Sequence, residues 1–94
     1  MPKFNFTSQE ILENTFIYPD EFVISMTFKN TGSTVVYVNN LPLLPSPSPG
    51  IAGESVSISA NSSGEFFSGN ISIVFQGGAG KLLAIQQFYL KESL

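Results

Sequence analysis

The sequence of 94 residues predicts one all-β domain, a small antiparallel β-sandwich or jelly-roll-like barrel of about six to seven strands. In residues 22–29, apolar side chains alternate with polar ones, which is the period of a half-buried strand. Further short apolar runs follow, each bounded by residues typical of turns. No segment keeps a helical period over a useful length. The chain is long enough for one hydrophobic core, so residues 1–94 are expected to form a single domain.

Residues 1–20 are expected to form an arm, either extended or containing one short helix. Thr7 and Glu10 have the spacing of a capping box, which favours a helix start. Extended or irregular chain is preferred, because weak helix formers follow at Asn14, Thr15 and Ile17.

The middle of the chain is expected to contain a hairpin followed by a loop. The alternating strand at 22–29 runs into a turn at 30–33, and a second β-rich run follows at 34–38. Residues 41–53 are expected to be a surface loop, because proline has no N–H to donate to a strand ladder. The prolines of this segment are Pro42, Pro45, Pro47 and Pro49.

The remaining strands are expected at 54–60, 71–75 and 82–90, with a glycine-rich hairpin loop at 76–80. The last strand is apolar on both faces, and we assign Leu83 and Ile85 to the core. Its other face would then carry Leu82, Ala84, Phe88 and Leu90. The complete predicted core is Phe22, Ile24, Met26, Phe28, Val36, Val38, Val56, Ile58, Ile71, Ile73, Phe75, Leu83 and Ile85.

Charge is scarce in this chain. Charged residues make up 12% of it, about half of the usual share. The surface is therefore largely neutral, which fits either a domain covered by partner subunits or a poorly charged monomer. The net charge is −3 and arginine is absent, so a basic patch for a nucleic-acid backbone cannot form. We expect no nucleic-acid partner.

Residue types with catalytic chemistry are also scarce, and we expect neither an enzyme nor a bound cofactor or metal ion. Histidine and cysteine are absent, which removes the common bases, thiolates and metal ligands. The carboxylates that could cleave a glycoside as a pair all lie at predicted turns or strand ends: Asp20, Glu21, Glu54 and Glu65. Residues 77–81 resemble a phosphate-binding loop, but a strand is expected after them instead of a helix.

No apolar stretch approaches the length that spans a bilayer, so no transmembrane segment is expected. The first residues lack the apolar core of a signal peptide. We therefore expect a product made in a cytoplasm, which would reach any structure outside the cell by assembly.

From Thr27 onward, six short motifs follow one another in a recognisable order. They are Phe-Lys-Asn-Thr-Gly at 28–32, Val-Tyr-Val-Asn at 36–39, Pro-Leu-Leu-Pro at 42–45, Gly-Glu-Ser at 53–55, Asn-Ser-Ser-Gly-Glu at 61–65 and Tyr-Leu at 89–90. This order resembles small β-sandwich proteins encoded among the virion genes of bacteriophages, especially those that infect Bacteroidetes. Two features differ from that pattern: residues 46–52 look like an insertion, and Gln86 and Gln87 stand where similar sequences often carry a basic pair.

The resemblance implies a non-enzymatic structural component of a phage virion, such as a minor capsid, vertex or decoration protein. Its partners would be other capsid proteins and further copies of itself, and it would be located in the virion after synthesis in the host cytoplasm. The alternative is a carbohydrate-binding attachment module, with Tyr37, Phe66 and Phe67 as a platform of aromatic rings.

An interface with neighbouring subunits is predicted on the last strand and the proline loop, because a lone sandwich buries only one face of that strand. The residues assigned to it are Phe88, Leu90, Pro45, Pro47, Pro49 and Ile51. The alternative is that the N-terminal segment folds back over the same stripe within one chain, through Phe4, Phe6, Ile11 and Phe16.

Overall fold

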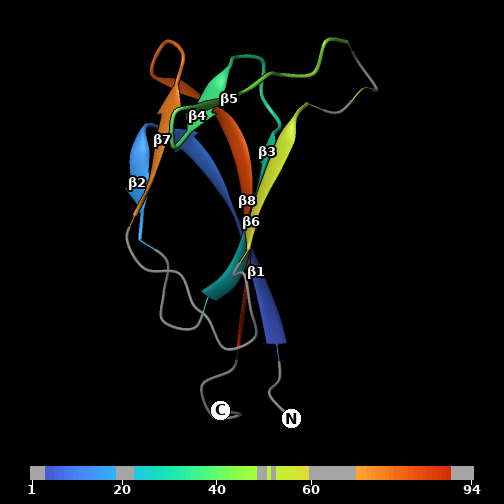
Figure 1. Ribbon diagram of the computed structural model, residues 1–94. Coiled ribbons are helices and arrows are strands. Elements are labelled where there is room, and N and C mark those ends of the chain that lie inside the picture. The colour runs from blue at the N-terminus through green and yellow to red at the C-terminus, as the bar shows by residue number, and fades with distance from the viewer. Residues whose placement is uncertain (1–3, 19–22, 49–50, 52, 60–69, 90–94) are drawn as a thin grey trace.

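The computed structural model describes residues 4–18, 23–48, 51, 53–59 and 70–89, and in these residues it contains eight strands and no helix. The strands form two four-stranded antiparallel sheets that face each other as two layers (Figure 1). This arrangement confirms the predicted all-β sandwich. The predicted strand number was too low, because two strands of only three residues each were missed.

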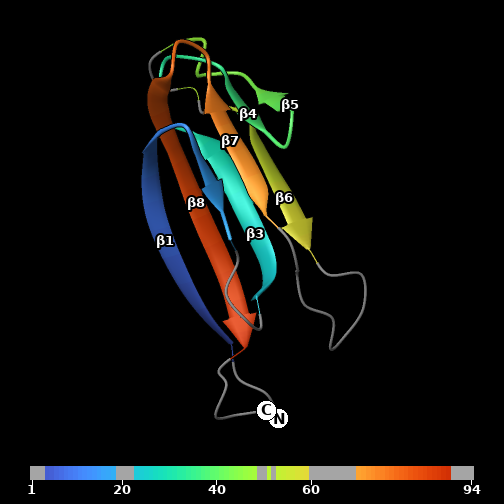
Figure 2. The same ribbon diagram turned by 90° about the vertical axis from the view of Figure 1, so that its left-hand side faces the viewer.

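The first sheet has the order β1-β8-β3-β6 and contains the long strands, which lie side by side in Figure 2. Its members are β1 (Phe4–Glu13), β8 (Ala79–Tyr89), β3 (Val23–Asn30) and β6 (Ser55–Ser59). The second sheet has the order β2-β7-β4-β5 and is shorter. Its members are β2 (Thr15–Ile17), β7 (Ile71–Phe75), β4 (Val36–Val38) and β5 (Leu41–Leu43).

The strand order is that of a jelly roll. Strands pair as β1 with β8, β2 with β7, β3 with β6 and β4 with β5, which are the successive rungs of one long antiparallel ribbon. When this ribbon folds over on itself, β8 lies beside β3 and β7 lies beside β4, which completes each four-stranded sheet. Eight strands in two such sheets define the jelly-roll architecture.

The helix considered for the N-terminal segment is wrong, because Thr7 and Glu10 lie within β1. They pair there with Gln86 and Leu83 of β8. Pairing with the long strand β8 satisfies the backbone groups on the side of the segment that faces β8, and this tertiary contact outweighs a local capping signal. The extended chain that was preferred over the helix is therefore correct.

The expectation that residues 41–53 form only a loop is corrected at its start, where Pro42 belongs to β5. β5 is an edge strand, and an edge strand tolerates proline because every second N–H points away from the sheet. Asn39 and Asn40 both have positive φ, 49° and 69°, so they make the two-residue turn that joins β4 to β5. Residues 44–48 are loop as expected, whereas Pro49 lies outside the described residues.

The hydrophobic core lies between the two sheets and matches the prediction for β4, β7 and most of β3. Val56 and Ile58 of β6 are partly buried against it. Phe22 was assigned to the core and lies outside the described residues. The buried apolar residues that form this core are Ile11, Ile17, Val23, Met26, Phe28, Val36, Val38, Leu43, Ile71, Ile73, Phe75, Leu82 and Ala84.

The inward-facing residues differ from the prediction at two places. In β3, Val23 is buried instead of Ile24, because a bulge between Val23 and Ser25 inserts one residue and reverses the alternation. In β8, Leu82 and Ala84 are buried, so Leu83 and Ile85 belong to the outer face. Both faces of β8 carry apolar residues, so the sequence pattern alone could not show which face is turned toward the core.

Asn30 at the end of β3 is buried, with 1% of its surface exposed, and it ties the loops at this end of the sandwich together. Its amide donates hydrogen bonds to the carbonyls of Thr34 at 2.8 Å and Leu43 at 2.9 Å. Its Oδ1 accepts one from the N–H of Gly32 at 3.0 Å. One side chain thus joins the turn after β3 to β5 of the opposite sheet.

Gly53→Ala is expected to lower the free energy of unfolding by about 1–3 kcal/mol, the usual cost of overpacking. A Cβ at position 53 would collide with the backbone carbonyl oxygen of Asn30, which cannot rotate away. Urea denaturation measures the loss. The matched control is Gly77→Ala. A Cβ at position 77 would meet no other atom, but the φ of +85° is strained for alanine. Its loss of unfolding free energy should be smaller and reports backbone strain alone. Equal stability of Gly53→Ala and the wild type would contradict the packing described here.

Candidate functional site

The outer face of the second sheet carries side chains without charge. On this face, Phe16 of β2 lies opposite Ser72 of β7. Two residues farther along β7, Val74 lies opposite Tyr37 of β4. Tyr37 in turn pairs with Pro42 on the edge strand β5. Phe16, Val74 and Tyr37 are 57%, 43% and 37% exposed, so a mostly apolar band crosses the sheet. Low charge with exposed aromatic residues is the composition of a contact surface.

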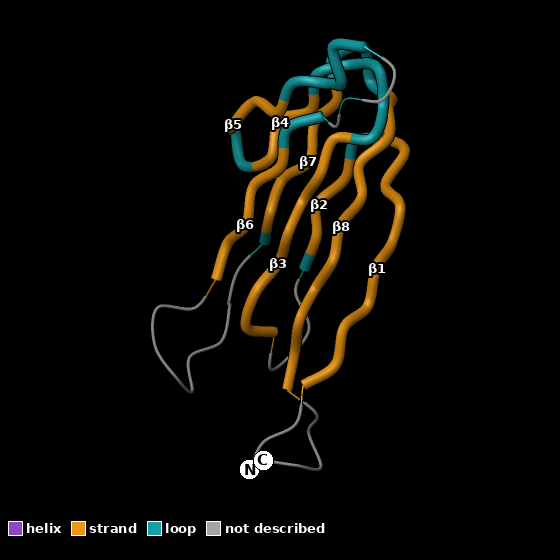
Figure 3. The backbone as a smooth tube through the Cα atoms, turned by 90° about the vertical axis from the view of Figure 1, so that its right-hand side faces the viewer, coloured by secondary structure: helices purple, strands orange, loops and turns teal. Residues whose placement is uncertain are grey.

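A second group of exposed apolar side chains lies on the β5 side of the sandwich. Leu41 of β5 and Leu44 and Ile51 of the following connection are each about half exposed, at 49%, 53% and 54%. We call these three residues the β5-side group. The described residues 44–48 of the connection between β5 and β6 lie at the end of the sandwich where β8 begins (Figure 3).

Hydrogen bonds fix the connection that carries the β5-side group. A carboxylate oxygen of Glu54 accepts a hydrogen bond from the N–H of Leu44 at 2.8 Å, and the N–H of Glu54 donates to the carbonyl of Leu44 at 2.9 Å. The hydroxyl of Ser46 lies between the carbonyls of Ser48 and Ile51, which share its one proton, and the N–H of Ile51 donates to the carbonyl of Ser48 at 3.1 Å. Leu44 and Ile51 are therefore held in a defined position although they face solvent.

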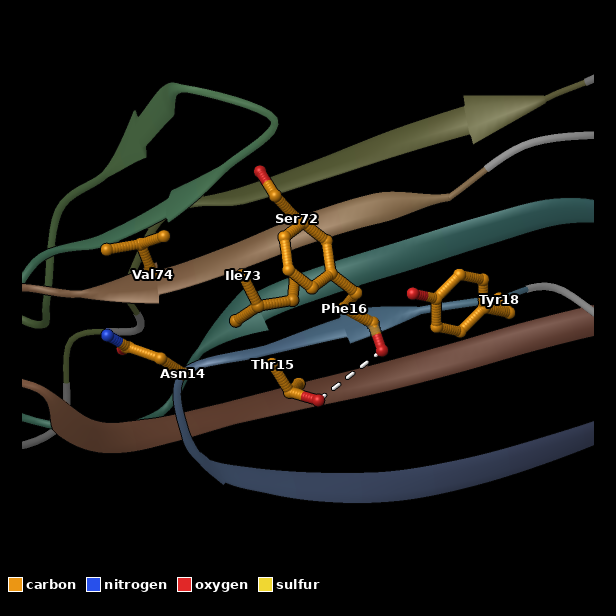
Figure 4. Close-up of a pocket in the computed structure, with 7 residues that line it drawn as sticks. All are labelled: Asn14, Thr15, Phe16, Tyr18, Ser72, Ile73 and Val74. Carbon is orange, nitrogen blue, oxygen red and sulfur yellow. Dashed lines mark hydrogen bonds between the residues drawn. The ribbon is translucent and has the colours of Figure 1, made fainter.

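The third surface feature is an open groove of about 350 Å³ at the β2 edge, which we call the β2–β7 groove. Figure 4 shows Asn14 and Val74 at one end of it, Tyr18 at the other, and Phe16 and Ser72 between them. Thr15 and Ile73 complete its lining. Only the alternate spacing of Phe16 and Tyr18 could have indicated this groove, and the sequence analysis places Phe16 in the alternative covering segment.

The predicted interface residues lie in different environments. Phe88 is partly buried and packs against the core, so its assignment to the outer face of β8 is wrong. Pro45 is partly buried, whereas Pro47 and Ile51 are exposed on the β5–β6 connection. Leu90 and Pro49 fall outside the described residues.

The N-terminal segment does not cover β8 in the way that the alternative prediction required. β1 lies beside β8 as the edge strand of the same sheet. Ile11 enters the core, but Phe6 is 62% exposed and Phe16 lies on the other sheet. The aromatic platform is described only in part, because Tyr37 is on the outer face of β4 while Phe66 and Phe67 lie outside the described residues.

The described residues offer little catalytic chemistry. Glu54 holds a loop through its bond to Leu44, and the described residues contain no group of three or more potential metal-binding side chains. Asp20, Glu21 and Glu65 lie outside these residues. Residues 76–78 form a turn between β7 and β8, with Gly77 and Gly78 at φ of 85° and 91°, and the strand after them excludes a phosphate loop on a helix. The described part of the chain contains no helix that is long and apolar enough to cross a membrane.

Comparisons with protein-family models, with curated proteins and with solved structures find no match to this chain. The jelly roll is therefore assigned from the strand order alone. Viral capsid proteins, lectins and cupins all use this architecture, so the fold by itself does not choose a function. The surfaces described above carry the functional inference.

Proposed function

We propose that this chain is a non-enzymatic structural component of a bacteriophage virion, as a minor capsid, vertex or decoration protein. The observation that carries this proposal is the β5-side group, in which three large apolar side chains are half exposed, one on β5 and two on the hydrogen-bonded connection that follows it. Exposed apolar residues that gather on a rigid surface mark contacts with other proteins. The motif order at 28–90 and the jelly-roll strand order support a coat protein as the kind of protein that uses such a contact.

The contact would form between the β5 side of this chain and an apolar surface of a neighbouring subunit. Leu41, Leu44 and Ile51 would be buried at its centre, and the neutral residues of the connection, such as Ser46 and Pro47, would form part of its rim. Among the described strands, β5 has a free edge, since β4 is its only neighbour in the sheet. Backbone groups along that edge can pair with a strand of the partner.

We expect the chain to be present in purified particles of the phage that encodes it, at a copy number that matches a symmetry class of the capsid. Quantitative mass spectrometry of particles purified by density gradient measures this copy number. Particles of an unrelated phage grown in the same host provide the control for carried-over protein. Absence of the chain from its own particles would rule out the structural function.

A further inference from the structure

The β2–β7 groove differs from the β5-side group in its chemistry, because it combines exposed aromatic rings with neutral polar groups. Phe16 and Tyr18 are 57% and 70% exposed. Asn14, Thr15 and Ser72 supply an amide and two hydroxyls around these rings. The remaining lining residues, Ile73 and Val74, are apolar. From this combination we propose that the groove is a binding site for an uncharged saccharide.

The aromatic rings match the apolar side of a sugar. A pyranose ring carries C–H groups on its faces, and the electron-rich face of an aromatic ring attracts them. Figure 4 shows the Phe16 ring extending from β2 across Ser72 of the neighbouring strand. The Tyr18 ring lies farther toward the other end of the groove. Two rings that are two residues apart along an extended chain can contact successive units of a glycan, and the phenol of Tyr18 adds a hydrogen-bonding group.

The polar groups match the hydroxyl rim of a sugar, and their positions are fixed by the backbone. The Oδ1 of Asn14 accepts a hydrogen bond from the N–H of Phe75 at 2.7 Å, which fixes the side chain and leaves its amide N–H groups for other partners. The backbone of Ser72 is held by Asn39, whose Oδ1 accepts from its N–H and whose N–H donates to its carbonyl, both at 2.9 Å. A fixed lining lowers the entropy that binding would otherwise cost.

The lining also argues for a neutral ligand. All seven lining residues are uncharged, so an anionic or cationic group would lose its hydration without gaining a partner. The volume of about 350 Å³ lies at the lower end of the range for small-molecule sites and suits one or two sugar units. A protein partner is favoured less here than at the β5 side, because polar groups alternate with the rings along the groove.

The groove and the β5-side group can be occupied together. β2 and β5 are the two outer strands of the second sheet, so about 14 Å separates them at the usual strand spacing. A chain bound to a particle through its β5 side would leave the β2 edge free. The saccharide site would then lie on the exposed part of the bound protein, where a cell-surface glycan can reach it.

Binding of neutral glycans to the purified full chain tests this proposal. We expect hits on an array of uncharged oligosaccharides, followed by millimolar binding of the matching mono- and disaccharides in NMR titrations. Phe16→Ala and Tyr18→Ala are each expected to weaken binding about three- to tenfold, as expected for loss of one stacking contact. Ser72→Ala should weaken it to a smaller extent, because one hydroxyl is lost while both rings remain.

The matched control is Phe6→Ala, which removes an equally exposed ring from the other sheet and should bind like the wild type. Thermal unfolding of each variant separates loss of binding from loss of fold, and Phe16 and Tyr18 are exposed enough that both variants should remain folded. The proposal is overturned if no neutral glycan binds to the wild type, or if both ring variants bind as tightly as Phe6→Ala. Neither result bears on the presence of the chain in particles, so the two proposals fail separately.

Discussion

Leu82→Ala is expected to lower the free energy of unfolding by about 2–5 kcal/mol, whereas Leu83→Ala should cost about 1 kcal/mol or less. Leu82 is completely buried in the core, opposite Ile11 of β1. Leu83 lies on the outer face of the same strand, between Glu10 and Lys29. Removal of three methyl-sized groups leaves a cavity only at the buried position.

This pair of variants is informative because the two residues are adjacent and identical. Urea denaturation of both proteins, with the denaturant slope checked for equality, gives the difference in stability. A domain of this size has about 5–15 kcal/mol of total stability, so Leu82→Ala should melt at a much lower temperature. If Leu83→Ala were the more destabilised variant, β8 would face the core with its other side, and the assignment of its faces would be wrong.

Asn30→Ala is expected to cost about 2–4 kcal/mol, although Asn30 lies beside a turn where polar residues are usually replaceable. Its side chain makes three hydrogen bonds while it is 1% exposed, and alanine would leave two carbonyls and one N–H without these partners. Each buried polar group that loses its partner costs about 1–3 kcal/mol, and water that enters the space recovers part of this. No short polar residue at position 30 other than asparagine offers both the donors and the acceptor in this geometry.

Denaturation of Asn30→Ala should be compared with that of Asn70→Ala, whose side chain is exposed at the start of β7 and should cost almost nothing. Amide hydrogen exchange adds a local readout, since the N–H of Gly32 should lose its protection in Asn30→Ala. If both variants were equally stable, Asn30 would be an ordinary turn residue and the junction of the two sheets would depend on other contacts.

The sandwich class could be predicted from the sequence because alternation in the central strands is unambiguous. Thr27 separates Met26 from Phe28 and Tyr37 separates Val36 from Val38, and the four flanking apolar residues are buried as predicted. The faces of β8 could not be predicted in the same way, because Leu82 to Ile85 are apolar throughout and either phase would bury leucine. Pairing with β1 and β3 decides the phase, and the sequence of β8 does not contain that information.

The short strands and the groove were missed for related reasons. β2 and β5 have three residues each, which is too short for a period to be visible, and β5 contains Pro42. Phe16 enters the sequence analysis only in the alternative of a covering segment, since a single exposed phenylalanine cannot be distinguished from a core residue by type alone. Its place beside Ser72 follows only from the pairing of β2 with β7, which joins residues far apart in the chain.

The proposed function depends most directly on uptake of the chain into particles through the β5-side group. A phage that lacks the gene can be complemented with the wild type, with the Leu44→Ser and Ile51→Ser double variant, or with Phe6→Ser as a control for an equally exposed ring on the other sheet. Both substitutions of the double variant lie at half-exposed positions, so the purified proteins should remain folded, which circular dichroism checks.

Quantitative mass spectrometry of the complemented particles then gives the copy number of each protein. We expect the wild type and Phe6→Ser at the same copy number and the folded double variant at less than about a tenth of it, which corresponds to a loss of roughly 1.4 kcal/mol or more at the contact. Equal copy numbers for all three proteins would contradict the assignment of the contact to the β5 side. Absence of the wild type from the particles would contradict the structural function itself.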